Sequence, residues 1–250
     1  MIHSFLLIGQ SNMAGRGLRE EEVWVDTTHI KTLRNGRWQR MFRPINPDRS
    51  FAGANLAEGF AEKYAERYGV DVGLICCADG GSSLDMWKPG SILFDNAVYQ
   101  ARLALRTSTI AGVLWHQGEA DCKENLAASY KERFEIMMQA FRKELDLYDV
   151  PFLVGGLGEF LVSCTLDPYV GNYAAVNKAL KEIAENNEMT GFVSAVGLTA
   201  NEDNLHFDSK SLYEFGLRYL DEYEKVKDPN KVFKEKASEE DAIRSPMESL

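Results

Sequence analysis

The sequence predicts an α/β protein built on a parallel β-sheet with helices on both faces. The chain has 250 residues, 45% of them hydrophobic, which is enough for one large domain with a buried core. Short apolar runs typical of buried strands alternate along the chain with longer segments of helical periodicity. This alternation of strand and helix favours parallel strand pairing.

The predicted elements follow from these two patterns. Continuous apolar runs predict strands at His3–Ile8, Val70–Cys77, Ile110–Trp115, Phe152–Gly155 and Gly191–Val196. Hydrophobic residues that recur along one helix face predict helices at Asn55–Tyr68, Leu93–Leu105, Glu124–Leu147, Tyr173–Asn186 and from Ser211 to about Lys225.

Two segments depart from the alternation. Residues 22–50 form an insertion in which Asn35-Gly36 lies between alternating residues, and this pattern predicts a type I′ β-hairpin. Residues 227–250 are charged and poor in large apolar residues. We expect this tail to be an appended helix or a partly disordered segment outside a catalytic domain at residues 1–226.

Charge and composition exclude several classes of protein. A formal net charge of −10 disfavours a nucleic-acid partner, because phosphate binding needs a basic face. No apolar stretch approaches the roughly 18 residues that span a bilayer. The first apolar run is too short for a signal peptide and lacks a basic flank, so we expect a cytoplasmic protein. The four cysteines show no C-x-x-C pairing, which favours reduced thiols over a disulfide or a zinc site.

The residues with catalytic chemistry all follow predicted strands. Ligands of open parallel sheets bind at the carboxyl ends of the strands, where the loops converge. The loops there contain Ser11, then Gly80 to Ser83, then His116, Gln117 and Glu119, and finally Asp203 and His206. We therefore expect one site at this edge of the sheet.

Ser11 is the candidate nucleophile of this site. It lies on the turn GQSNMAG directly after the first predicted strand, where a structural role in a turn or a helix cap is an alternative. The turn is not the G-x-S-x-G elbow of α/β-hydrolases, because Met13 stands in place of the second glycine. Assignment of Ser11 therefore depends on a base, an orienting acid and oxyanion donors nearby.

His206 is the best candidate base. Of the four histidines, His3 begins a predicted strand and His29 lies in the insertion, whereas His116 ends the third strand and is an alternative. Asp203 precedes His206 by three residues, so one short loop can hold the carboxylate beside the imidazole.

Candidate oxyanion donors come from three loops. The backbone N–H of Ser11 can contribute, and either Gly80 or Gly81 can add another because neither has a Cβ to block close approach. The side-chain amide of Gln117 can also donate, or it can brace its own loop as a buried residue. Three further residues are candidate substrate contacts: Gln10, Asn12 and Trp87.

Four sequence blocks together resemble those of a known superfamily. In chain order they are GQSNMAGRG, DGGSSLDMW, WHQGEAD and DNLHFDS. They resemble the SGNH hydrolases, and more specifically the carbohydrate esterase family 6 and sialate O-acetylesterase-like branch, which includes acetylxylan esterases. The resemblance covers residues 4 to about 209 and implies a flavodoxin-like three-layer α/β/α sandwich with a central parallel sheet.

The resemblance also implies a reaction and roles for individual residues. It implies removal of acetyl groups from O-acetylated sugars without a metal or another cofactor. Ser11 then corresponds to the nucleophile and His206 to the base, with Gly81 and Gln117 at the oxyanion-hole positions. Asp203 is the favoured triad acid, and Glu119 is the alternative that some members of this branch use.

Two other functions stay open at this stage. One is an esterase or thioesterase that acts on small acyl or lipid substrates, and the other is a carbohydrate-binding relative that has lost catalysis. The sequence has no obvious apolar lid, which argues against a lipid substrate. It contains every member of the triad, which argues against an inactive binding protein, so we favour the carbohydrate esterase.

Overall fold

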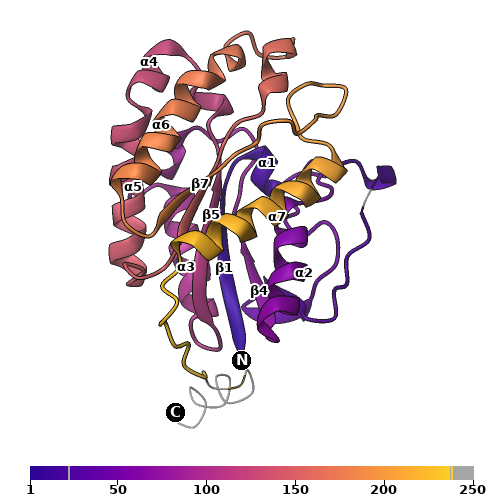
Figure 1. Ribbon diagram of the computed structural model, residues 1–250, viewed down its shortest axis with the longest axis vertical. Coiled ribbons are helices and arrows are strands. Elements are labelled where there is room, and N and C mark those ends of the chain that lie inside the picture. Colours follow the sequence, from indigo (N-terminus) through magenta and orange to yellow (C-terminus); the bar gives the residue numbers. More distant parts are fainter. Residues whose placement is uncertain (22, 237, 239–250) are drawn as a thin grey trace.

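Seven strands form one sheet in the computed structural model of the protein, which describes residues 1–21, 23–236 and 238 (Figure 1). The strands are β1 (Ile2–Gly9), β2 (Ile30–Arg34), β3 (Arg37–Arg40), β4 (Asp71–Cys76), β5 (Thr109–His116), β6 (Phe152–Gly155) and β7 (Thr190–Val193). Their spatial order is β3-β2-β4-β1-β5-β6-β7. All neighbours pair in parallel except β2 and β3.

The order β4-β1-β5-β6-β7 is the flavodoxin-like arrangement, which confirms the predicted fold class. In such a sheet the strands that follow β1 in the chain are added on both sides of it, so the connections on the two sides cross opposite faces of the sheet. The loops that leave β1 and its two neighbours therefore diverge and open a crevice at their carboxyl ends.

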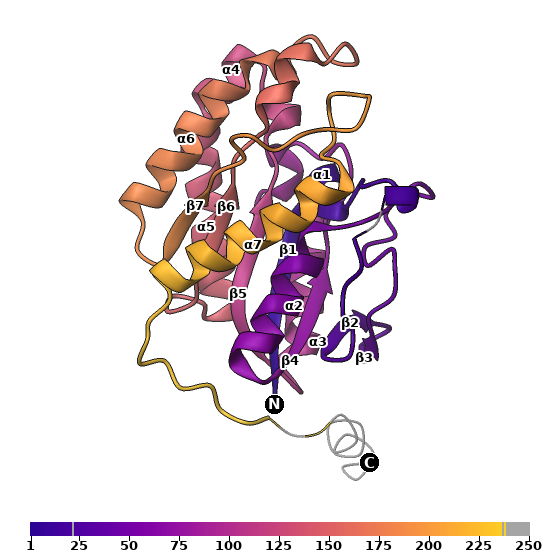
Figure 2. The same cartoon turned by 45° about the vertical axis from the view of Figure 1, so that its right-hand side comes forward.

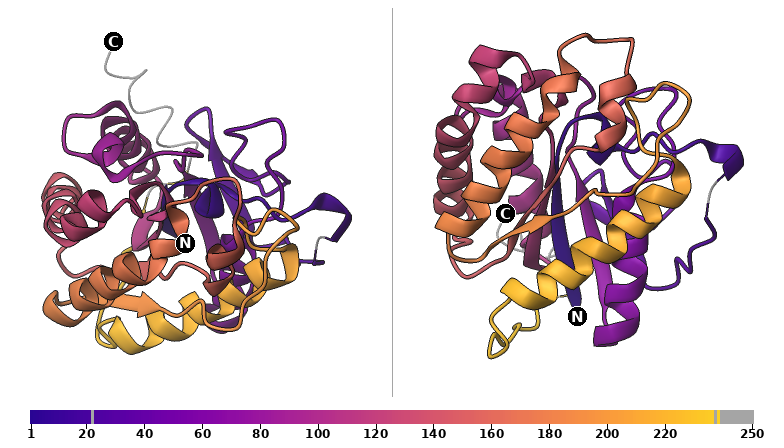
Figure 3. Two further views of the ribbon diagram at one scale, coloured as in Figure 1. Left: turned by 90° about the horizontal axis from the view of Figure 1, so that it is seen from above. Right: turned by 45° about the horizontal axis from the view of Figure 1, so that its top comes forward.

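Helices cover both faces of the sheet, as Figures 2 and 3 show. One face carries α2 (Leu56–Tyr68) and α7 (Ser209–Val226), and the other carries α3 (Ile92–Ala104), α5 (Tyr130–Leu145) and α6 (Tyr173–Asn186). The shorter helices are α1 (Ser11–Ala14), α4 (Glu124–Ala128), and the 3₁₀ turns η1 (Arg19–Glu21), η2 (Leu84–Trp87), η3 (Glu119–Asp121), η4 (Glu159–Ser163) and η5 (Val170–Asn172).

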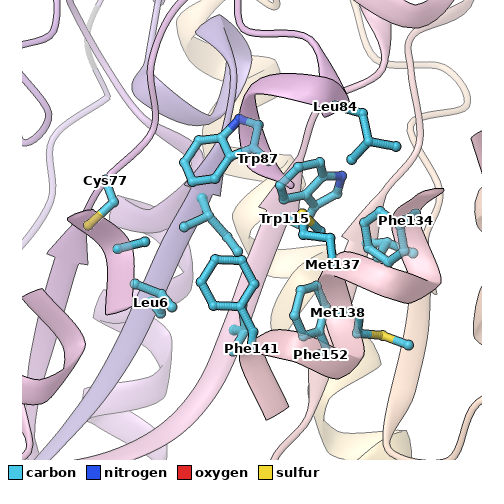
Figure 4. Close-up of a cluster of buried hydrophobic side chains, with 14 of the residues drawn as sticks. Leu6, Cys77, Leu84, Trp87, Trp115, Phe134, Met137, Met138, Phe141 and Phe152 are labelled. Atoms are coloured by element: carbon cyan, nitrogen blue, oxygen red, sulfur yellow. The ribbon is translucent and has the colours of Figure 1, made fainter. Parts of the chain in front are cut away.

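Strand β1 is buried on both faces, which explains its continuous apolar sequence. Phe5 and Leu7 pack in the core beneath α2 and α7. Leu6 and Ile8 point to the opposite face and pack in the core beneath α3, α5 and α6. Figure 4 shows Leu6 in this second core, close to the aromatic side chains that fill it.

The predicted strands and helices agree with the structure except at a few boundaries. The long helix predicted over Glu124–Leu147 divides into α4 and α5 at Ser129, whose hydroxyl bonds the carbonyl of Asn125 at 3.3 Å. Helix α7 begins two residues earlier than predicted, at Ser209, because Asp208 caps it by accepting a hydrogen bond from the Ser211 N–H at 2.7 Å.

The predicted hairpin is confirmed. Asn35 and Gly36 have φ angles of 51° and 73°, as a type I′ turn requires, and they join the antiparallel strands β2 and β3. The sequence did not predict that β2 also pairs in parallel with β4. The insertion thus extends the central sheet instead of standing apart from it.

The tail runs back along the bottom of the sheet. Described residues 227–236 form no helix, and the Phe233 ring packs on His3 with ring centroids 4.1 Å apart. The rest of the tail prediction concerns residues 237 and 239–250, which lie outside the described residues. No helix among the described residues is long and apolar enough to cross a membrane.

Gly9 controls how the chain leaves β1. Its φ is +138°, and a Cβ at this position would lie 2.1 Å from the carbonyl oxygen of His116. The same carbonyl accepts the N–H of Gln10 at 2.9 Å. Only glycine allows the end of β1 to lie this close to β5 while the chain turns into α1.

We therefore expect Gly9→Ala to destabilise the fold. The added methyl group combines a steric clash with a disfavoured φ angle, which should lower the free energy of unfolding by about 2–5 kcal/mol. Urea denaturation measures this change. Gly171→Ala is the matched control, because a Cβ at Gly171 meets nothing within 4 Å, and it should cost less than about 0.5 kcal/mol. Equal stabilities of the two variants would contradict the role assigned to Gly9.

Candidate active site

Ser11 is the first residue of α1, directly beyond β1 and in the crevice between the loops that follow its two neighbouring strands. The loop after β4 lies on one side of it and the loop after β5 on the other. His206 and Asp203 lie on the loop that precedes α7. The loops predicted to converge therefore do so.

Ser11, His206 and Asp203 form one chain of hydrogen bonds. The Ser11 Oγ lies 3.0 Å from the His206 Nε2, and the His206 Nδ1 lies 2.6 Å from the Asp203 Oδ2. A carboxylate can only accept, so the Nδ1 carries the proton and the Nε2 is left to accept from the serine hydroxyl. This is the tautomer that a general base requires.

Asp203 is held in its ionised form. Burial acts to raise the pKa of its carboxyl, but hydrogen bonds from the backbone N–H groups of His206 and Leu205 and from the imidazole outweigh this effect. The net pKa lies below the ordinary aspartate value. These bonds therefore stabilise the folded protein fully when the pH is above the ordinary aspartate pKa. Their contribution is lost as the pH falls through the lowered pKa of Asp203.

Glu119 makes no hydrogen bond to His206. Its Oε1 accepts from the Nδ2 of Asn12 at 2.5 Å, and its side chain is buried. The geometry thus favours Asp203 over Glu119 as the residue that orients the histidine. Glu119 instead links the loop after β5 to the turn that carries Ser11.

Asn12 has a structural role in place of the expected contact with substrate. It is 1% exposed. In addition to its bond with Glu119, its amide donates to the carbonyl of Leu205 at 3.2 Å and accepts the N–H of Phe207 at 3.1 Å. Asn12 therefore ties the serine turn directly to the backbone on both sides of His206.

The prediction that Gln117 donates to an oxyanion needs correction. Its amide nitrogen bonds the Asp121 carboxylate at 2.6 Å and the Ser82 carbonyl at 3.2 Å, and its amide oxygen accepts from the Tyr130 hydroxyl at 3.0 Å. The side chain is fully buried. Both amide hydrogens are used within the protein, so Gln117 braces the loops after β4 and β5, the structural alternative considered above.

His116, the alternative base, lies within the core. It is fully buried, and its Nε2 lies 3.1 Å from the Gly156 carbonyl. Burial lowers its pKa, which keeps the ring neutral. It forms no hydrogen bond to Ser11, so His206 alone is placed to accept the serine proton.

The structure distinguishes between the two candidate glycines. The N–H of Gly80 donates to the Asp48 Oδ2 at 2.9 Å and is therefore occupied. Gly81 has a φ of +79° in a turn closed by the Ser82 N–H and the Asp79 carbonyl, a conformation that favours glycine. Among the described residues, nothing accepts a hydrogen bond from the N–H of Gly81 or from that of Ser11.

Gln10 offers a further donor. Its Oε1 accepts the backbone N–H groups of Gly118 at 3.4 Å and Ala120 at 3.3 Å. These bonds fix the amide so that its nitrogen, which bonds no other described residue, is on the side away from that loop. A cavity of about 380 Å³ adjoins this position, and Gln10, Ser11, Gly81 and His206 all line it.

A buried ion pair that the sequence did not reveal supports the glycine loop. The guanidinium of Arg16 bonds both oxygens of Asp48, at 3.0 and 2.7 Å, and the two side chains are only 4% and 5% exposed. Asp48 in turn holds Gly80. In the sequence, Arg16 stands within the serine block GQSNMAGRG, and nothing there pairs it with an aspartate in the insertion.

Trp87 does not contact the cavity, contrary to expectation. It is fully buried, its Nε1 bonds the Ser82 hydroxyl at 2.9 Å, and its ring packs edge-on against Trp115 at 5.7 Å (Figure 4). Trp87 thus belongs to the core beneath the rim loops. No group of three or more His, Cys, Asp or Glu side chains in the described part of the chain is arranged to bind a metal ion.

A hydrogen-bonded serine, histidine and aspartate lie at the carboxyl edge of the flavodoxin-like sheet, which is the arrangement that the resemblance to SGNH-type ester hydrolases implies. Residues 1–225 match the family model described as "Carbohydrate esterase, sialic acid-specific acetylesterase". The chain belongs to this family, and it is a carbohydrate esterase.

Individual relatives agree with this assignment. A probable carbohydrate esterase from Arabidopsis thaliana is 26% identical over 242 residues, which cover 88% of this chain and 89% of the relative. A solved Arabidopsis thaliana structure is 27% identical, with a TM-score of 0.77 over 89% of this chain and 98% of that one. The crystal structure of NanS, at 17% identity, has a TM-score of 0.69 over 90% of this chain and 97% of its own, which supports the fold alone.

The bracing role of Gln117 predicts a loss of stability. Gln117→Ala removes one hydrogen-bond partner from each of the buried Asp121, Ser82 and Tyr130 groups, which should lower the free energy of unfolding by about 2–4 kcal/mol. Thermal and urea denaturation measure the change, and Gln139→Ala, on the exposed face of α5, is the control.

Enzyme kinetics on the same variant separate the two roles of Gln117. A bracing residue should affect kcat and KM together, because both loops shift. Unchanged stability with a selective loss of about 10²-fold to 10³-fold in kcat, as expected for an oxyanion donor, would reverse the assignment.

Proposed function

We propose that the protein is a serine esterase that removes O-acetyl groups from acetylated carbohydrates through an acetyl-serine intermediate. The observation that carries this proposal is the hydrogen-bonded series Ser11–His206–Asp203 at the edge of the cavity. Family membership supports the carbohydrate ester as substrate. No cofactor takes part in the proposed reaction.

The first half of the reaction forms the acetyl-enzyme. The His206 Nε2 takes the proton of the Ser11 hydroxyl as the Oγ attacks the acetyl carbonyl carbon, and the carbonyl oxygen becomes an oxyanion. Asp203 stabilises the imidazolium that forms. When the tetrahedral intermediate collapses, the bond to the sugar oxygen breaks, and His206 returns its proton to that oxygen.

The second half releases acetate. His206 takes a proton from a water molecule, which attacks the acetyl-serine carbonyl through a second tetrahedral intermediate. Collapse breaks the bond to the Ser11 Oγ, and the imidazolium reprotonates that oxygen. Acetate leaves, and the enzyme returns to its starting state.

The proposed oxyanion hole combines the N–H groups of Ser11 and Gly81 with the amide nitrogen of Gln10. All three residues line the cavity, and the three nitrogens donate to no other described residue. Donors fixed in advance stabilise the oxyanion without reorganisation in the transition state. In this proposal Gln10 replaces Gln117 as the side-chain donor.

We expect Ser11→Ala to abolish hydrolysis with little effect on the fold. Loss of a triad nucleophile should lower kcat by about 10⁴-fold to 10⁶-fold, whereas removal of one hydroxyl from a turn leaves no core cavity. Acetate release from a panel of O-acetylated sugars, compared with an acyl series from acetate to octanoate esters, measures both activity and substrate class.

Three outcomes of that assay would reject the proposal. Residual activity above about a tenth of wild type would exclude Ser11 as the nucleophile. A wild-type enzyme that prefers octanoate over every acetylated sugar would make it a lipid esterase, and a wild type inactive on all esters would make it a binding protein.

The choice of triad acid predicts unequal effects of two nearly isosteric substitutions. Asp203→Asn removes the acceptor that fixes the His206 tautomer, so kcat/KM should fall by about 10⁴-fold. Glu119→Gln should cost far less, because its side-chain oxygen can still accept from Asn12. Steady-state kinetics with melting temperatures distinguish the two variants, and a larger kinetic loss for Glu119→Gln would transfer the role to Glu119.

A further inference from the structure

We propose that Phe51 is the surface on which the sugar ring of the substrate stacks, and hence a determinant of specificity for carbohydrate esters. This inference rests on the proposed function. It replaces Trp87, which the structure buries, with an aromatic side chain that substrate can reach.

Phe51 combines exposure with direct access to the catalytic residues. Its side chain is 68% exposed, although aromatic side chains of this size gain much from burial. It lines the same cavity as Ser11 and His206. An exposed aromatic ring at the rim of a catalytic cavity is typical of a surface that a ligand covers.

The backbone around Phe51 is anchored on both sides. The Ala52 carbonyl accepts from the Arg19 guanidinium at 3.1 Å, and the Gly53 N–H donates to the Gly15 carbonyl at 3.2 Å, next to the serine turn. On the other side, Asp48 holds Gly80. Phe51 therefore has a fixed position relative to the nucleophile and the glycine loop, as a binding surface requires.

The ring itself is also held in place. The Arg16 guanidinium lies over it, with the Cζ 5.2 Å from the ring centroid, which is a cation–π contact. Arg16 is fixed in turn by its two bonds to Asp48. The Phe51 side chain therefore loses less conformational entropy when substrate binds.

The chemistry of the cavity favours a sugar ring over an acyl chain. A pyranose presents axial C–H groups on one face and hydroxyl groups around its edge. Phe51 offers an apolar face to the first, while Arg49 and Asp167, which also line the cavity, offer polar groups to the second. An acyl chain offers no hydrogen-bonding group to these two charged side chains.

The test compares two acetate esters, with an octanoate ester as the acyl-chain comparison, in wild type and in Phe51→Ala, Phe51→Leu and Phe51→Trp. One is an O-acetylated pyranoside on which the wild type is active, and the other is ethyl acetate, which has no ring to stack. We expect Phe51→Ala to lower kcat/KM on the sugar ester by about fivefold to thirtyfold more than on ethyl acetate, mainly through KM. Phe51→Leu should resemble Phe51→Ala, and Phe51→Trp should retain the wild-type preference.

Phe42→Ala is the matched control. Phe42 is also exposed, at 53%, and has the Arg34 guanidinium over its ring at 4.1 Å, but it does not line the cavity. Its replacement should leave both rates unchanged.

Three outcomes would overturn the inference. Equal losses on the two esters in Phe51→Ala would mean that Phe51 supports the catalytic loops without contacting the sugar. Full activity of Phe51→Leu on the sugar ester would mean that apolar area suffices without stacking. A larger loss on octanoate esters than on the sugar acetate would make Phe51 an acyl-chain contact. Failure of the wild type on every O-acetylated pyranoside of the panel would instead reject the proposed function itself.

Discussion

The buried side chain of Asn12 is the junction on which the active-site geometry depends. Its one amide group bonds the Glu119 carboxylate, the Leu205 carbonyl and the Phe207 N–H. These groups belong to two loops that are distant from Asn12 in sequence. A hydrogen bond 3.0 Å long between Ser11 and His206 tolerates little movement of either loop. Asn12, next to Ser11 in the chain, holds the two loops at a fixed distance from each other. Because its side chain is buried, water does not compete for its hydrogen bonds.

The rim loops are held by polar groups that the core encloses, whereas the sheet beneath them is held by apolar packing. Asp121, which is fully buried, accepts from Gln117, from the Leu84 N–H and from Arg133. Enclosed charges of this kind contribute little net stability compared with apolar side chains, but they strongly oppose any arrangement that leaves them unpaired. The loops consequently have one favoured geometry, which suits a site whose donors must be fixed in advance.

The sequence was sufficient for the five central strands of the sheet and for placing Ser11, His206 and Asp203 together, because both depend on local patterns. Apolar runs located the strands, and Asp203 and His206 share one short loop. The side-chain directions of Gln117 and Trp87 could not be predicted in the same way. Each has a partner that only the folded chain brings close, the Ser82 carbonyl for Gln117 and the Trp115 ring for Trp87. The same limitation hid the pairing of β2 with β4, since a hairpin turn specifies its own two strands but not their neighbour.

That pairing also determines what the sheet presents to other molecules. Without the hairpin, β4 would expose a long apolar edge with open backbone groups, which is a template for aggregation. Strand β2 covers part of this edge, and β3 then becomes the outermost strand. It is four residues long, and Arg37, Gln39 and Arg40 are exposed on it. A short edge with positive charge is poorly suited to adding a strand from another chain, so the insertion protects this edge of the sheet.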